Sequence, residues 1–183
     1  MRKSGVFSTF LFLSIVGAGL YGILHDQITA SISPEYFTRF KFTQFRIDTH
    51  TPFRTGVSFV GFYATWWAGA IIGLILGLTA LIFPDYKTMR KALYRSLLAV
   101  FGITVLTGIA GFFYGKYFQG TDNLSRWIPS ELQDRNGFIL TGTIHNFSYA
   151  GGFTGLMAGF VYLISENKKI RKGQPVGEKK FWY

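Results

Sequence analysis

Residues 56–83 read GVSFVGFYATWWAGAIIGLILGLTALIF, a run that contains no Asp, Glu, Lys or Arg. A helix needs about 20 mostly apolar residues to cross the roughly 30 Å hydrocarbon core of a bilayer. Three further stretches meet this requirement and also lack those four residue types, at residues 5–24, 97–115 and 143–165. We therefore predict an all-α protein in which residues 1–183 form a single membrane domain, an integral membrane four-helix bundle.

The overall composition also favours a membrane protein over a soluble one. Of 183 residues, 49% are hydrophobic and only 15% are charged, which is too apolar for an ordinary soluble domain. Arg2 and Lys3 precede the first apolar run, as in a signal peptide, but the run exceeds the about 7 to 15 apolar residues of such peptides. We expect it to remain as an uncleaved anchor. The chain has no cysteine, which excludes disulfides and thiolate metal sites.

The net charge of +10 follows the expected topology. Basic residues dominate the N-terminus, the loop between the second and third spans, and the tail 166–183, whereas the loops 25–55 and 116–142 are nearly balanced. The positive-inside tendency then predicts that both termini and the basic tail are cytoplasmic and that the two long loops are extracytoplasmic. This distribution indicates the lipid bilayer as the partner and disfavours nucleic acid.

Small residues spaced four apart form a stripe on each span, where missing side chains let helix backbones approach closely. The stripes predict helix packing within the chain, although a homo-oligomer or a larger membrane complex would use the same surfaces. The glycines assigned to this role are Gly22 in the first span, Gly69, Gly73 and Gly77 in the second, Gly111 and Gly115 in the third, and Gly151, Gly155 and Gly159 in the fourth.

The two outer loops are too long to be simple turns and are expected to carry short interfacial helices. In the first loop, Ser33 is a suitable N-cap before Pro34, which predicts a helix over residues 34–40. In the second loop, Ser130 and Gln133 form a capping-box pattern, which predicts a helix around residues 131–135.

Polar, titratable side chains gather where two spans meet the outer loops. His25 and Asp26 end the first span, and His145 opens the fourth. Helical phase places each histidine on the small-residue stripe of its span, so both rings should point into the bundle. The candidate polar or ligand site comprises His25, Asp26, Gln27, Glu35, His145 and Asn146.

Three interpretations of this cluster remain open. The first is a satisfied hydrogen-bond network that holds the outer loops to the bundle. The second is a metal or haem b site formed by His25, His145 and Asp26, since neutral imidazole is a common transition-metal ligand. The third is a substrate or proton site. The spacing is only weakly specific for a metal, so no cofactor is favoured.

The sequence lacks the familiar signatures of catalysis and transport. There is no phosphate-binding glycine loop after a strand, no G-x-S-x-G turn and no H-E-x-x-H helix. The spans contain no charged residue that would mark an ion path near the midplane. We therefore favour a non-enzymatic accessory, scaffold or binding protein. A metal- or haem-binding protein using His25 and His145 is the alternative, and a component of a small-solute transporter comes third.

Several motifs together resemble one family. They are YGILHDQIT at residues 21–29, SPEYFT at 33–38, FKF at 40–42, QF at 44–45, ATWW at 64–67 and HNFSY at 145–149. This pattern is similar to that of a family of small uncharacterised bacterial inner-membrane proteins. The resemblance covers most of the chain. It implies a multi-pass protein of the bacterial inner (cytoplasmic) membrane, and it implies no reaction and no catalytic residue.

Overall fold

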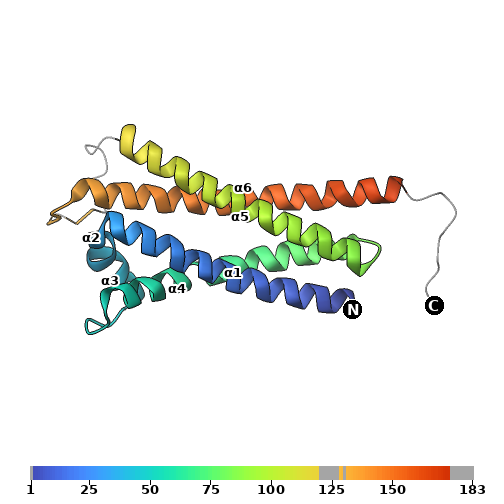
Figure 1. The fold of residues 1–183 in the computed structure, drawn as a ribbon, viewed down its shortest axis with the longest axis horizontal. Helices are drawn as coiled ribbons and strands as arrows, with labels where there is room; N and C mark the ends of the chain where they lie inside the picture. Colours follow the sequence, from blue (N-terminus) through green and yellow to red (C-terminus); the bar gives the residue numbers. More distant parts are fainter. Residues whose placement is uncertain (1, 120–127, 130, 174–183) are drawn as a thin grey trace.

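The structure is a computed structural model that describes residues 2–119, 128–129 and 131–173. It contains four long helices, namely α1 (Lys3–Ile32), α4 (Phe53–Thr79), α5 (Tyr86–Tyr117) and α6 (Arg135–Lys172) (Figure 1). Helix α4 continues into a 3-10 turn, η2 (Ala80–Ile82). All four helices are long and apolar enough to cross a membrane. The prediction of an all-α membrane bundle is confirmed.

The bundle consists of two antiparallel helix pairs. Helix α1 packs along α4, and α5 packs along α6, while the contacts between the two pairs are much sparser (Figure 1). Each pair is formed by helices that follow each other in the sequence, so each is a helical hairpin. The first turn of α1 and the last turn of α6 lie at the same end of the bundle, which is also the end that holds the α4–α5 turn.

The helices extend beyond the predicted spans because polar residues cap them further out. Helix α1 continues to Ile32 and stops where Ser33 adopts an extended conformation before Pro34, as expected for a residue that precedes proline. Helix α6 begins at Arg135, and the Asp134 side chain caps it by accepting a hydrogen bond from the backbone N–H of Gly137. His25 and His145, which end and open apolar runs of the sequence, therefore both lie inside long helices.

A short segment after α1 folds over one end of the bundle, and we call residues 33–46 the cap. It contains α2 (Pro34–Tyr36), a π-helical turn η1 (Phe37–Lys41) and α3 (Phe42–Phe45). The Ser33 hydroxyl accepts a hydrogen bond from the backbone N–H of Tyr36, and Arg46 ends the segment in the left-handed conformation, with φ 52°. The predicted short helix between the first two spans is confirmed, although it is divided into three turns.

The prediction of a second short helix, around residues 131–135, is wrong for the residues that the structure describes. Residues 131–134 are not helical, and Ser130, its expected N-cap, lies outside the described residues. The backbone N–H groups of Gln133 and Asp134 instead donate to the carboxylate of Glu35 in the cap, at 3.1 and 2.7 Å. Since these donors and the Asp134 side chain serve the cap and α6, the segment joins two elements and forms no helix of its own.

The helices of each pair approach so closely that no side chain fits between them at several points. A Cβ atom on Gly22 would overlap the backbone of Gly61 on α4, and one on Gly155 would lie 2.9 Å from the Cα of Val100 on α5. Among the other glycines assigned to packing, Gly69, Gly73 and Gly77 face α1, Gly111 and Gly115 face α6, and Gly151 faces α5. Gly159 differs, because its nearest neighbours lie at an ordinary 3.4–3.5 Å.

A pair of matched glycine substitutions tests this packing. Gly22→Ala should lower the free energy of unfolding by about 1–3 kcal/mol, because the added methyl group forces α1 away from α4. Gly17→Ala adds the same methyl group to the same helix, where nothing lies within 4 Å, and should be neutral or slightly stabilising. Unfolding of each variant in mixed micelles by added denaturing detergent measures the difference. Equal stabilities of the two variants would refute the close-approach argument.

Candidate functional site

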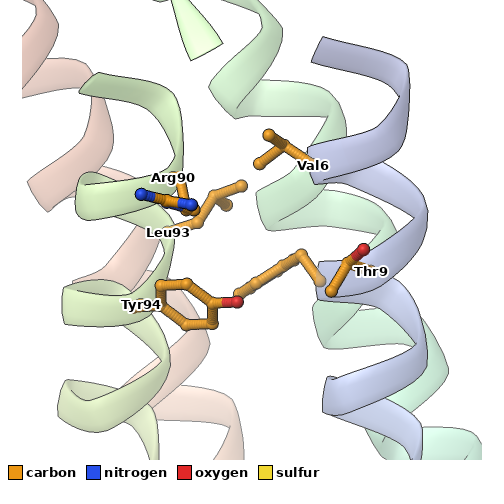
Figure 2. Close-up of a pocket in the computed structure, with 6 residues that line it drawn as sticks. Val6, Thr9, Arg90, Leu93 and Tyr94 are labelled. Atoms are coloured by element: carbon orange, nitrogen blue, oxygen red, sulfur yellow. The ribbon is translucent and has the colours of Figure 1, made fainter. Parts of the chain in front are cut away.

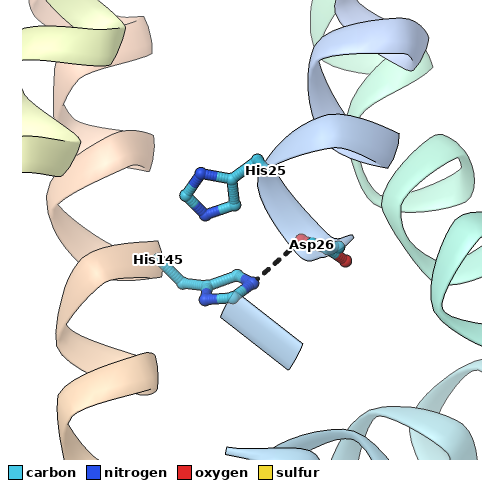
Figure 3. A group of neighbouring side chains, drawn as sticks. All are labelled: His25, Asp26 and His145. Atoms are coloured by element: carbon cyan, nitrogen blue, oxygen red, sulfur yellow. Dashed lines mark hydrogen bonds and ion pairs between the residues drawn. The ribbon is translucent and has the colours of Figure 1, made fainter. Parts of the chain in front are cut away.

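A buried cluster of three titratable side chains lies where α1 meets α6. His25 and Asp26 come from α1 and His145 from α6, and their side chains converge (Figure 3). The Nε2 atom of His145 lies 3.1 Å from Oδ1 of Asp26, and each of these two residues is only 3% exposed. The ring centroids of the two histidines are 4.7 Å apart, in an edge-to-face arrangement. Both rings thus point into the interior of the bundle, as their helical phase predicted.

The hydrogen bonds of His145 place one of its ring protons on Nδ1. Its Nδ1 atom is 2.9 Å from the backbone carbonyl oxygen of Thr141. A carbonyl can only accept, so Nδ1 carries a hydrogen and donates it. The Nε2 atom faces the Asp26 carboxyl group, and one proton is held between them, on the ring nitrogen or on the carboxyl oxygen. A metal ion in the place of this proton would bind the lone pair of Nε2.

His25 is only partly satisfied. Its Nδ1 atom lies 3.4 Å from the hydroxyl group of Tyr21, one helical turn earlier, at the long limit of a hydrogen bond. Its Nε2 atom is one of five buried side-chain polar atoms that have no hydrogen-bond partner among the described residues. Buried polar atoms are nearly always paired, and an unpaired one calls for an explanation such as a bound water or ion.

Aromatic side chains surround the histidine pair. The ring centroids of Tyr36 and Phe37, both in the cap, lie 5.0 and 6.2 Å from that of His145, and Tyr149 on α6 lies 6.2 Å away. Tyr36 and Phe37 are themselves buried. Burial raises the pKa of the Tyr36 phenol above its ordinary value, so this residue remains neutral. The cap thus closes the cluster with rings that carry no charge.

A buried lysine in the cap adds a positive charge near the cluster. Lys41 is 6% exposed, and its Nζ atom donates to Oε1 of Gln44 at 3.1 Å. Its Nζ atom also lies 5.7 Å from the centroid of Tyr36 and 5.0 Å from that of Phe40, within cation–π range. Burial lowers the pKa of the Lys41 ammonium group, and the negative charge of Asp26 opposes this effect.

The other predicted site residues lie elsewhere. Gln27 points to α4, where its amide donates to the carbonyl of Arg54 and to the hydroxyl of Ser58. Glu35 joins the cap to the start of α6. Asn146 is exposed on α6. None of these three belongs to the group whose ligand atoms lie together. Gln27 and Asn146 directly follow Asp26 and His145 and so face other directions, whereas Glu35 lies in the cap.

Sequence reasoning missed the residues that complete the cluster. Tyr21 lies four positions before His25, a spacing that places both on one helical face, so this contact was open to prediction. The fold of the cap brings Tyr36 and Phe37 against His145 and places Lys41 nearby. No local sequence pattern indicates this fold. The contact with the backbone carbonyl of Thr141 cannot be predicted from a motif, because motifs describe side chains.

Figure 2 shows a gap between α1 and α5 at the other end of the bundle, lined by Val6, Thr9, Phe10, Arg90, Leu93 and Tyr94. Its volume is about 10 Å³, which is space for about one water molecule. This gap therefore offers no room for a substrate.

Comparison with known proteins does not assign the chain to a family. No family model, curated protein or solved structure matches the chain.

The three side chains suit metal coordination better than haem binding. One ligand atom from each of His25, Asp26 and His145 lies within 4.8 Å of the others. Ligands of a tetrahedral ion at metal distances of about 2.0–2.2 Å are roughly 3.4 Å apart, so modest side-chain rotations bring them into range. Haem ligation by two histidines needs a macrocycle between the rings, whereas here the rings are in contact under the aromatic cap.

The bond between Glu35 and α6 gives a prediction about pH. The backbone N–H groups of Asp134 and Gln133 hold the pKa of the Glu35 carboxyl below its ordinary value of 4.5. Because this pKa is lower in the folded state, its stabilising contribution is complete above the unfolded value and is lost as the pH falls through the folded value. Protection of the Gln133 and Asp134 amides from hydrogen exchange, corrected for intrinsic rates, should therefore fall below about pH 4.5.

The variant Glu35→Gln provides the control for this measurement. It should show reduced protection of both amides at neutral pH, with no further loss on acidification over that range. If the variant loses protection at the same pH as the native protein, another group controls this contact.

Proposed function

We propose that this four-span membrane protein binds one divalent transition-metal ion through His25, Asp26 and His145. The observation that supports the proposal most directly is the convergence of two imidazoles and a carboxylate inside the bundle, with Nε2 of His25 left unpaired. A hydrogen-bond network alone leaves that buried nitrogen unexplained. A bound ion would give it a partner.

The hydrogen bonds around the cluster match those of metal-binding histidines. Such a residue donates its second ring N–H to a carboxylate, carbonyl or water, which fixes the tautomer and the ring orientation. His145 does so through Nδ1 to Thr141, and His25 has the Tyr21 hydroxyl beside its Nδ1. Both Nε2 atoms are then available as ligands. Two histidines and one carboxylate form a donor set typical of Zn²⁺ and related ions.

Three protein ligands leave one position of a tetrahedral ion for water or another ligand. We assign no reaction to that position. We therefore propose a binding or accessory role without catalysis. It corresponds to the metal-binding alternative that the sequence suggested.

We further propose the orientation and the setting of the site. The basic residues gather at the end of the bundle that holds the α4–α5 turn and the end of α6, and the positive-inside tendency assigns that end to the cytoplasm. The metal site and the cap then face the extracytoplasmic side. The motif resemblance supports a bacterial inner membrane as the location.

Metal binding by matched variants tests the proposed function. The full chain, purified in detergent and stripped by a chelator, should bind one Zn²⁺ per molecule in a calorimetric titration. His25→Gln and His145→Gln should each weaken binding at least about 100-fold, since even loss of a residue that only orients a ligand costs 10–100-fold. His50→Gln is the matched control, because His50 is exposed in the loop that precedes α4, and it should bind as the native protein does.

The variant Asp26→Asn separates metal binding from folding. An amide keeps a hydrogen bond to Nε2 of His145 but is a poorer ligand than a carboxylate, so this protein should remain folded by circular dichroism and bind Zn²⁺ more weakly. If the native chain takes up no Zn²⁺, or if the His25 and His145 variants retain full affinity, the metal proposal is wrong.

A further inference from the structure

A second cavity, whose lining contains none of His25, Asp26 and His145, opens where residues 45–51 meet the first turns of α4. It has a volume of about 620 Å³. Its lining combines charged, polar and apolar residues, namely Arg46 and Asp48, Thr51, and Phe45, Ile47, Phe59 and Tyr63. A site of this volume accommodates part of an amphiphile rather than a single water or ion.

The charged side chains of Arg46 and Asp48 line the same groove but do not form an ion pair with each other. Among the described residues there is no ion pair between Arg46 and Asp48, and the Arg46 guanidinium makes no hydrogen bond. Asp48 accepts one hydrogen bond from the backbone N–H of His50. The nearby Arg54 differs, because its guanidinium is engaged by Gln27 and Ser31 on α1. The groove therefore holds one available cation and one available carboxylate.

The backbone of Arg46 is held in an unusual conformation. It occupies the left-handed region, with φ 52°, which is uncommon for a residue other than glycine, asparagine or aspartate and costs about 1 kcal/mol. A glycine would end α3 in this conformation at a lower cost. A binding role for the Arg46 side chain in the groove would explain why an arginine occupies this position.

The apolar wall of the groove continues onto the outer surface of α4. Phe59 and Tyr63 are four residues apart, on one face of the helix, and they are 47% and 53% exposed. Helix α4 is one of the four helices able to cross a membrane. The groove thus runs from a polar loop at the end of the bundle to a surface that hydrocarbon chains cover in a bilayer.

We propose that this groove binds a membrane phospholipid with a primary amine in its headgroup, of the phosphatidylethanolamine type. Arg46 pairs with the phosphate, which suits the planar guanidinium, and Asp48 pairs with the ammonium group. Phe59 and Tyr63 contact the acyl chain. The charge pattern selects this class, because a headgroup without an amine leaves the Asp48 carboxylate without a cationic partner. The proposal is independent of metal binding.

Lipid binding to the full chain in detergent tests the inference by native mass spectrometry. The probes are phosphatidylethanolamine, phosphatidylglycerol and phosphatidylcholine with identical dioleoyl chains, together with inorganic phosphate. Phosphatidylethanolamine should bind best. Arg46→Gln should weaken its binding about tenfold, the loss expected for a hydrogen-bonded charge. Asp48→Asn should abolish the preference for phosphatidylethanolamine over phosphatidylglycerol.

Arg39→Gln is the matched control, since Arg39 is an exposed cation of the same cap that does not line the groove, and it should leave lipid binding unchanged. Equal binding of the three lipids would overturn the proposal, because it would show adhesion through acyl chains alone. Full competition by inorganic phosphate, or an effect of Arg39→Gln as large as that of Arg46→Gln, would overturn it as well. Circular dichroism of each variant confirms that the bundle is retained.

Discussion

The close approach of helix backbones is the constraint on which this structure depends. Inside a bilayer, the hydrophobic effect no longer drives helices together, so they associate through van der Waals packing and hydrogen bonds. Glycine stripes allow α1 to lie against α4 and α5 against α6, with contacts such as that of Gly22 with Gly61. The two tight pairs meet each other more loosely. At one place where they meet, polar groups replace apolar packing, and that place is the centre formed by His25, Asp26 and His145.

Much of the fold was predictable because membrane spans are encoded locally. Four uncharged apolar runs predicted four helices, and the structure contains them. The helix ends were not predictable in the same way, because hydropathy detects the hydrocarbon-compatible part of a helix and ignores its polar extensions. Helix α1 continues through residues 25–32, and α6 begins well before His145. The prediction of the second short helix was wrong for another reason. The backbone N–H groups of Gln133 and Asp134 donate to Glu35, which lies 98 positions before Gln133, and no local pattern indicates this contact.

The candidate site was predictable in its core and unpredictable in its surroundings. Helical phase placed His25 and His145 inside the bundle, but phase on separate helices does not tell whether two side chains meet. Proximity in sequence was misleading for Gln27, which follows Asp26 yet points to α4. The aromatic cover and the buried Lys41 depend on how the cap folds back, and that arrangement includes a π-helical turn with no clear signature in the sequence.

The division of the centre between α1 and α6 has a consequence for biogenesis. Each helix pair is contiguous in the chain, so each hairpin can insert into the bilayer as a unit before the two associate. Neither hairpin alone contains both histidines, and the centre is complete only after this last step. A ligand that binds the complete centre and not the separate hairpins adds its binding free energy to their association. Occupancy of the centre would thereby distinguish an assembled protein from one that has merely been inserted.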